Sequence, residues 1–430
     1  MKPVSGGFLI DLRRLPGILQ IMLNQNYHKF PSLSFRNIHP HIPEAGAIYI
    51  ANSIKTFAES LVGVFIPIFI LKLPNLPLIN SNDLINRILW VLIFYFFRSI
   101  FILLLLKPLT NIIFGRINLK WSIFISNVVL AFSLLCLSIA DKSTHMLILA
   151  SFLVAAAIIM YWLPFHLFFI RKLGTKDGHY GKRYGFQILF DSTSAAIAPL
   201  TGGIILTLFG FQALFATGII VILISAIPIV SSVTEHAHGK HNAYYTLLNF
   251  IKDPKYKNDS IAMASIASDS ILYAVFWPIM LIIVLESFEK VGAITSISIA
   301  ISSLVAIMVG IQIDKGRSKI LHKIGVAVNS MLFIIRAFVF TPISVYLIDI
   351  FDRMNGAFYV VPFTSAMYKH AREGHHDSDF IIYREYVVHG IMAVTTLAAF
   401  ILLFFIPRWQ YIFILTAIVS PFVYWVQKKR

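Results

Sequence analysis

Long apolar runs follow one another along almost the whole chain, and short polar stretches separate them. A run of roughly 20 apolar residues is long enough to cross the hydrocarbon core of a bilayer as a helix. Segments with alternating polar and apolar positions do not recur, so the pattern does not favour a membrane barrel. It predicts an all-α integral membrane protein with twelve transmembrane helices, at about 47–71, 84–106, 121–140, 146–170, 184–207, 211–232, 259–285, 291–313, 321–340, 343–368, 379–404 and 410–427.

The longest polar stretch inside the chain, residues 233–258, divides these twelve spans six and six. We therefore expect four parts. They are a basic, amphipathic N-terminal tail (1–46), a six-helix bundle (47–232), a central loop (233–258), and a second six-helix bundle with a short basic tail (259–430).

Short segments of the first half recur in the second half, in the same order and at a nearly constant offset. Such internal similarity is typical of a duplicated structural unit. The two halves are therefore predicted to be pseudo-symmetric. The matching segments are VFIPIFI (64–70) with VFWPIML (275–281), YWLPF (161–165) with YVVPF (359–363), and FGR (114–116) with KGR (315–317).

The composition agrees with a membrane protein. The 430 residues are 58% hydrophobic and 13% charged, whereas about a quarter of a soluble domain is charged. If the protein were soluble, its formal net charge of +16 could indicate that it binds nucleic acid. Here most Lys and Arg fall in the tails and in the loops after even-numbered spans, as the positive-inside rule predicts. We expect a multi-pass protein of the cytoplasmic (inner) membrane, with both termini cytoplasmic and no nucleic acid partner.

The loop after the predicted span 291–313 reads VGIQIDKGRSK (309–319) and resembles the signature loop of the major facilitator superfamily. The equivalent loop of the first half keeps a glycine-arginine pair but has Ile113 in place of the acid. The segment APLTGGIIL (198–206) is also similar to the fifth helix of many exporters of that superfamily. The resemblance implies two six-helix bundles and alternating access. The motif residues are Gly310, Asp314, Lys315, Gly316 and Arg317.

In the family this loop stabilises one access state as a latch. From the pseudo-symmetry of the two halves we expect Asp314 near the start of the fifth span, with Arg183 as its candidate partner. A carboxylate there can bind a cation or a helix N-terminus. The alternative is an ordinary basic loop at the inner membrane face.

Charged residues inside the predicted spans are the candidate functional groups, because they usually face a bundle interior or a water-filled cavity. Lys55 and Glu59 are one turn apart and share a helix face. Glu59 and Asp269 precede the repeated prolines by similar distances, so they are expected at similar depth. Proton coupling or substrate contact is predicted, and a permanent ion pair of Glu59 with Lys55 or Arg98 is the alternative. The candidate cavity or coupling residues are Lys55, Glu59, Arg98, Asp191 and Asp269.

We interpret a second group of charged residues as structural or gating ion pairs. Asp349 and Arg353 are again one turn apart. Arg384 and Glu385 lie close to a span end, where long side chains reach water easily; they are either part of an inner gate or simple surface contacts. This group consists of Arg336, Asp349, Asp352, Arg353, Arg384 and Glu385.

Aromatic residues near the repeated prolines are interpreted as the apolar part of a substrate site, with packing as the alternative. They are Phe65, Tyr161, Trp162, Tyr273, Phe276 and Trp277. Histidine-rich loop segments around His236 and His375 could bind metal, but solvated loop is the preferred interpretation. No metal and no cofactor are expected. The sequence contains no glycine-rich phosphate-binding loop, so ATP is not expected as the energy source.

Together these features predict a secondary active transporter that moves a small, partly apolar molecule. We expect proton coupling, export rather than import, and a monomer in the lipid bilayer. Uptake of a sugar-like nutrient is the alternative within the class. A non-transporting membrane sensor and an integral-membrane enzyme are the alternatives outside it, and the chain is not expected to be an enzyme.

Overall fold

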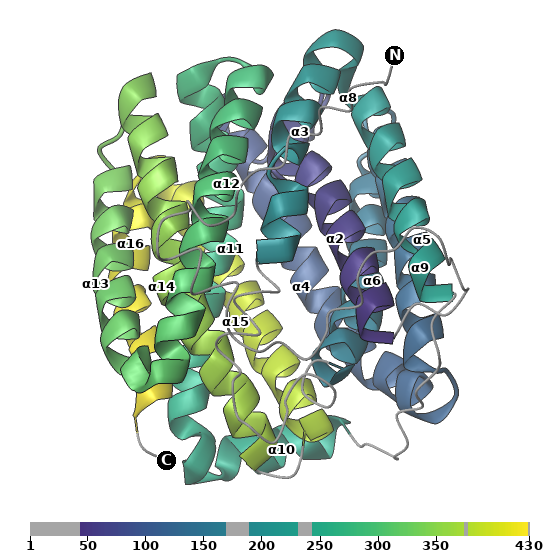
Figure 1. The fold of residues 1–430 in the computed structure, drawn as a ribbon. Coiled ribbons are helices and arrows are strands. Elements are labelled where there is room, and N and C mark those ends of the chain that lie inside the picture. Colours follow the sequence, from purple (N-terminus) through teal and green to yellow (C-terminus); the bar gives the residue numbers. More distant parts are fainter. Residues whose placement is uncertain (1–43, 169–188, 231–242, 374–376, 429–430) are drawn as a thin grey trace, which may run out of the picture. The chain divides into compact units, whose positions relative to one another are not determined.

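The structure of the protein, a computed structural model, describes residues 44–168, 189–230, 243–373 and 377–428. Regular structure in these four stretches is helical throughout (Figure 1). The first helices are α2 (Glu44–Gly63), α3 (Phe65–Leu71), α4 (Asp83–Gly115), α5 (Leu119–Ser138) and α6 (His145–Phe168).

The predicted span 47–71 is broken at Val64 into α2 and α3. Pro67 explains the break, because proline has no N–H and its ring clashes with the carbonyl four residues earlier, here that of Gly63. Helix α4 begins at a side-chain cap, since the Asn82 side chain accepts a hydrogen bond from the backbone N–H of Ile85 (3.1 Å).

Residues 189–195 are helical as well, and the chain then continues through α8 (Ala198–Ser225) and α9 (Ile227–Val230). Helix α8 turns sharply at Gly210, whose φ of 80° lies in the left-handed region that favours glycine. The short helix α10 (Ala243–Lys252) lies at the lower edge of Figure 1.

The remaining chain is a succession of long helices. Helix α12 passes into α13 through a short segment that contains Gly316, which has a φ of 82°. In order, these elements are η3 (Pro254–Tyr256), α11 (Lys257–Leu285), α12 (Phe288–Gln312), η4 (Ile313–Arg317), α13 (Ser318–Arg336), α14 (Pro342–Glu373), α15 (Asp377–Phe405), α16 (Tyr411–Val419) and η5 (Ser420–Gln427).

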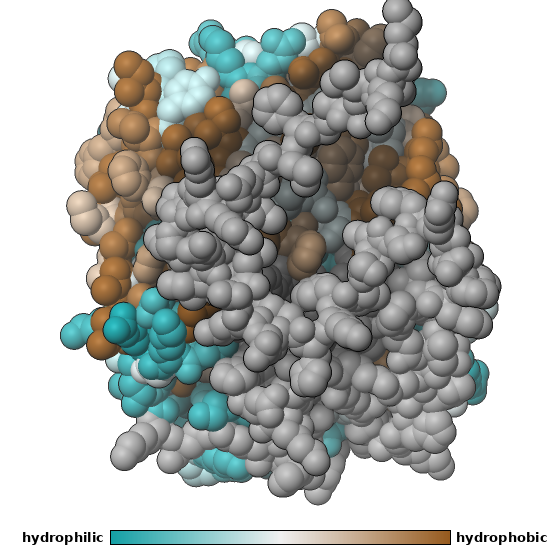
Figure 2. Space-filling model, in the orientation of Figure 1, coloured by the Kyte–Doolittle hydropathy of each residue, from teal (hydrophilic) through white to brown (hydrophobic). Residues whose placement is uncertain are grey.

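Eight helical stretches in the described part of the chain are long and apolar enough to cross a membrane. Two of them, Leu189–Ile229 and Phe288–Arg336, are 41 and 49 residues long, and each contains one of the two positive-φ glycines. Large apolar side chains such as Phe405 and Ile343 are more than 70% exposed. Apolar residues also cover much of the visible flank in Figure 2, while polar ones gather at its upper and lower edges. Such a surface suits contact with lipid.

The helices pack along their lengths. Helix α5 lies along α6 and α8, α2 lies along α8, α12 lies along α14, and α13 lies along α14 and α16. Elements from the two sides of residues 233–258 also meet, because α4 packs on α15, α8 on α12, and α3 on α11.

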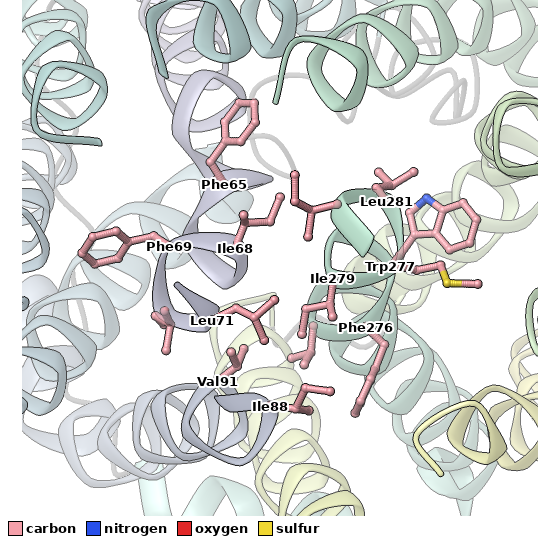
Figure 3. Packing of buried hydrophobic residues seen from close by; sticks show 14 of the residues in the cluster. Phe65, Ile68, Phe69, Leu71, Ile88, Val91, Phe276, Trp277, Ile279 and Leu281 are labelled. Carbon is pink, nitrogen blue, oxygen red and sulfur yellow. The ribbon is translucent and has the colours of Figure 1, made fainter. Parts of the chain in front are cut away.

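The contact between α3 and α11 is apolar. Figure 3 shows Leu71 of α3 close to Ile279 of α11 and to Val91 of α4. Ile68 of α3 and Ile88 of α4 belong to the same group. All five side chains are buried in one hydrophobic cluster. This cluster holds together segments that lie about half a chain apart in sequence.

The contact between α8 and α12 includes a close approach of the two backbones. A Cβ atom on Gly292 would lie 2.2 Å from the carbonyl oxygen of Pro199, and one on Gly203 would lie 2.5 Å from that of Phe288. The backbone N–H of Leu200 also donates to the Ser296 hydroxyl (2.9 Å). Small residues allow helices to approach this closely in membranes. The segment 198–206, identified by its small residues, therefore has a packing role.

Candidate functional site

Lys55 and Glu59 form an ion pair on one face of α2. The Lys55 side chain is 3% exposed, whereas that of Glu59 is 40% exposed. A buried ammonium needs a compensating negative charge. Glu59 provides it from a position that remains open to its surroundings.

Two aromatic rings of α6 cover the Lys55 ammonium. Its Nζ atom lies 4.0 Å from the ring centroid of Tyr161 and 5.7 Å from that of Trp162. Both distances are within the range of cation–π attraction. Both residues are among the six aromatic residues suggested by the sequence, and here they contact a charged group.

Hydrogen bonds connect Tyr161, one of the two rings that cover Lys55, to the helical stretch 189–195. The Tyr161 hydroxyl donates to Asn52 Oδ1 (2.5 Å), and Asn52 Nδ2 donates to Asp191 Oδ1 (2.7 Å). The structure thus brings together three of the predicted residues, Lys55, Glu59 and Asp191. We call Asn52, Lys55, Glu59, Tyr161, Trp162 and Asp191 the α2 polar cluster.

Asn52 was missed by the sequence reasoning. It lies three residues before Lys55 and seven before Glu59, a spacing that places all three on one face of a helix. An uncharged polar residue at this spacing was the signal that could have identified it.

Arg98 does not join the α2 polar cluster. Its guanidinium lies 4.6 Å from the ring centroid of Tyr95 on the same helix, α4. Within the described part of the chain, the ion-pair partner of Glu59 is Lys55 and not Arg98.

Asp269 lies among α11, α13, α14 and η5. Its Oδ2 atom accepts hydrogen bonds from the Tyr359 hydroxyl and from Asn329 Nδ2, the latter at 3.1 Å. Asn329 Nδ2 also donates to the Ser420 hydroxyl (2.7 Å). Asp269 is 4% exposed, and its Oδ1 atom has no hydrogen-bond partner among the described residues. We call Asp269, Asn329, Tyr359 and Ser420 the α11 acid cluster.

A third group contains two ion pairs between α13 and α14 and within α14. Arg336 pairs with Asp352, and Arg353 Nε donates to Asp349 Oδ2 (3.1 Å). The other Asp349 oxygen accepts from Trp277 Nε1 (2.7 Å). Arg336 is fully buried, and its guanidinium carbon lies 4.4 to 5.1 Å from the ring centroids of Phe333, Tyr273 and Trp277.

A fourth group connects α6 with α14 and α15. His166 Nδ1 lies 2.8 Å from the Tyr368 hydroxyl, and Arg384 Nη1 lies 3.3 Å from His166 Nε2. Arg384 also pairs with Glu385, whose second oxygen is 3.2 Å from His389 Nε2. Sequence reasoning identified Arg384 and Glu385 but missed His166, because nothing in the sequence places the end of α6 beside α15.

Of the signature-loop residues, Asp314 is partly buried, and Lys315, Gly316 and Arg317 are exposed. Gly310 is buried at the end of α12. Arg183 lies outside the described residues, so the latch between Asp314 and Arg183 stays a prediction.

Phe65, Phe276 and Trp277 are at most 1% exposed and lie in a packed apolar cluster (Figure 3). Packing, the alternative interpretation, accounts for the position of Phe65 and Phe276, whereas Trp277 also contacts Arg336 and Asp349. His236 and His375 lie outside the described residues. Among those the structure describes, no three His, Cys, Asp or Glu side chains gather in a way that could hold a metal ion.

Comparison with known proteins assigns the chain to a family by its sequence. The family model described as Major Facilitator Superfamily matches residues 48–384. No curated protein matches the chain by sequence.

Solved structures provide a likeness of fold. An auto-inhibited peptide transporter of the POT family is 10% identical, with a TM-score of 0.66 over 89% of this chain and 96% of that chain. The Escherichia coli fucose:proton symporter is 12% identical, with a TM-score of 0.60 over 89% of this chain and 97% of that chain.

Proposed function

Because the chain belongs to the major facilitator superfamily, we propose that it is a secondary transporter that couples the movement of a small molecule to that of protons. Both solved structures compared above are transporters by their descriptions, and one is a proton symporter. The observation that carries the proposal for this chain is the α2 polar cluster. It combines a buried lysine with an acid that is open to its surroundings.

We propose twelve membrane crossings in two six-helix bundles. The stretches Leu189–Ile229 and Phe288–Arg336 are each about twice the roughly 20 residues that one crossing needs. Their positive-φ glycines provide the turns. Helix α14, which is long enough but carries several charges, and the apolar stretch Tyr411–Gln427 supply the remaining crossings.

Both termini are proposed to be cytoplasmic, since the basic residues gather in the tails and in the loops on that side. Rocking of the two bundles would then expose a site near the membrane midplane to each side in turn. Export is the proposed direction, from the similarity of segment 198–206 to exporters. Sugar-like uptake is the alternative.

The chemistry of the α2 polar cluster suits a coupling site. When Glu59 binds a proton, its ion pair with Lys55 is lost, and among the described residues the rings of Tyr161 and Trp162 still contact the ammonium. Cation–π contacts of this kind are worth about 0.5–2 kcal/mol, so they compensate in part. Protonation of one exposed carboxylate would thus change how strongly α2 is bound to α6.

The first experiment is a thermal-shift screen of the purified full-length protein against sugars, amino acids, peptides, drugs and metal salts, at pH 6 and pH 8. A ligand that binds the folded state raises its melting temperature by mass action. We expect a selective hit whose effect depends on pH in the wild type and no longer does so in Glu59→Gln. Glu289→Gln, which changes an exposed acid at the start of α12, is the matched control.

Transport of the hit is then measured in proteoliposomes containing a pH-sensitive dye. Proton movement that accompanies the substrate in the wild type and stops in Glu59→Gln supports the proposal. Substrate movement without protons, or unchanged coupling in Glu59→Gln, would refute the role of Glu59. The direction of the imposed gradient that drives net flux distinguishes export from uptake.

A further inference from the structure

Arg98 lies near the middle of the 33-residue helix α4 and forms no ion pair with a carboxylate of the described residues. Three other cations inside the described spans each have such a partner, in the pairs Lys55–Glu59, Arg336–Asp352 and Arg353–Asp349. A guanidinium group stays charged at physiological pH, and an unpaired charge inside a membrane is costly. The place of Arg98 therefore requires an explanation.

An aromatic ring covers the Arg98 guanidinium without using its hydrogen-bond donors. The guanidinium carbon lies 4.6 Å from the ring centroid of Tyr95, which is one turn earlier on α4. A ring face attracts the positive charge, but it has no lone pair to accept from the five N–H groups in the guanidinium plane. The Nε atom is buried without a partner, and no other hydrogen bond joins the guanidinium to a described residue. The N–H donors are thus available to a ligand.

Arg98 lies on the face of α4 that points into the protein. Its neighbours one turn before and after, Tyr95 and Ile102, are buried. Leu104 and Lys107, about 120° and 180° away around the helix, are exposed. Arg98 itself is partly exposed. A partly exposed side chain between buried neighbours on an inward face borders a space inside the protein and not the lipid.

The depth of Arg98 matches that of the α2 polar cluster. Helices α4 and α6 pack along one another, and α5 alone lies between them in the chain, so they run in the same direction in the arrangement proposed above. Arg98 follows Asp83, which begins α4, by 15 residues, and Tyr161 follows His145, which begins α6, by 16. Both are therefore about 22–24 Å from the start of their helices. This is the level near the membrane midplane where a transported molecule is expected.

We propose that Arg98 binds the oxyanion group, a carboxylate or a phosphate, of the transported molecule. This proposal rests on the transport function proposed above and names the chemical class of its substrate. Two oxygens of such a group match the guanidinium fork and accept two parallel N–H bonds. The ring of Tyr95 covers one face of the guanidinium and leaves the edge that carries these donors open.

A negative charge suits this position better than a neutral polar group does. A bound oxyanion gives Arg98 the partner that the other three cations find within the protein. A ligand without the charge would leave the guanidinium uncompensated, and one without acceptors would leave its N–H groups unpaired. Sites built around a buried hydrogen-bonding group reject ligands that lack the matching group.

The test is a thermal-shift titration of the purified full-length protein with matched pairs of compounds at constant ionic strength. The pairs are benzoate with benzamide, lactate with lactamide, and glycerol phosphate with glycerol. We expect at least one anion to raise the melting temperature by mass action and its neutral analogue not to do so. The carboxylate and phosphate arms show which oxyanion the site prefers.

Arg98→Gln is expected to weaken the affinity for that anion at least about tenfold, because a charge-assisted hydrogen-bonded pair is lost. Lys107→Gln removes an exposed cation of the same helix and should leave the affinity unchanged. Arg98→Lys keeps the charge but not the planar fork, so it should bind at least about threefold more weakly than the wild type. It serves as the test if melting curves without ligand show that Arg98→Gln is not folded.

Stabilisation by the neutral analogues equal to that by the anions, or by none of the anions, would overturn the proposal. So would wild-type affinity in a folded Arg98 variant. Proteoliposome transport distinguishes this failure from that of the proposed function. A neutral compound carried together with protons would leave proton-coupled transport intact and refute the anion site. An anion that needs Arg98 but crosses without protons would support the site and refute the coupling.

Discussion

His166 Nδ1 and the Tyr368 hydroxyl lie 2.8 Å apart although the two residues are separated by 202 positions in the chain. Arg384 Nη1, which can only donate, lies 3.3 Å from the other ring nitrogen of His166. In the neutral imidazole the proton is therefore on Nδ1, which donates to the Tyr368 oxygen. This hydrogen bond joins the end of α6 to α14.

Tyr368→Phe is expected to loosen this junction, because it leaves the Nδ1–H of His166 without an acceptor. A buried hydrogen bond contributes about 0.5–1.5 kcal/mol, so local opening should increase roughly two- to tenfold. Hydrogen exchange of the backbone amides near Arg384 measures it. Tyr386→Phe, a change on α15 outside this contact, should have no such effect, and equal exchange in both variants would contradict the prediction.

The Lys55–Glu59 pair should respond unequally to loss of its two members. Glu59→Leu leaves a buried ammonium and should cost about 3 kcal/mol, at the low end for breaking a buried pair, since the rings of Tyr161 and Trp162 remain. Lys55→Met leaves a carboxylate that is 40% exposed and should cost no more than about 1 kcal/mol. Denaturant unfolding in detergent compares them. Equal losses would show that exposure does not decide the cost.

Arg336→Met is expected to destabilise the protein by about 3–5 kcal/mol, because Asp352 would lose the partner that compensates its charge. The double variant Arg336→Met with Asp352→Leu should recover most of this loss, as apolar replacements of buried ion pairs often do. Melting temperatures of the three proteins test the prediction. A double variant no better than the single one would mean that Arg336 acts mainly through its aromatic neighbours.

Gly292→Ala should separate α8 from α12, because its new methyl group would lie 2.2 Å from the Pro199 carbonyl oxygen. Overpacking of this kind costs about 1–3 kcal/mol. Gly390→Ala is the matched control, since nothing lies within 4 Å of its added Cβ and alanine favours a helix by about 1 kcal/mol. Thermal unfolding should show opposite signs for the two variants.

Hydrophobic pattern was sufficient to place helices near their observed bounds, as with 291–313 for α12 (Phe288–Gln312). It did not reveal the break at Val64 or the change to a 3-10 helix at Ser420, because both arise from local backbone geometry within apolar runs. Prolines at 67 and 421 were visible in the sequence.

Spacing within one helix also identified pairs. Lys55 with Glu59, and Asp349 with Arg353, are four residues apart and form ion pairs. Contacts between helices could not be derived this way, because they depend on how each helix is rotated. Asn52 with Asp191, and His166 with Arg384, are of this second kind.

The α8–α12 contact has a mechanical consequence. Helices that meet through interlocked side chains can move past one another only if those side chains change rotamer. At this contact the backbones meet directly, with no side chain between each glycine and the opposite carbonyl oxygen: Gly292 faces Pro199, and Gly203 faces Phe288. Two such surfaces can tilt while they stay touching. We therefore expect this contact to be maintained as a pivot while the helices before residues 233–258 rotate relative to those after them.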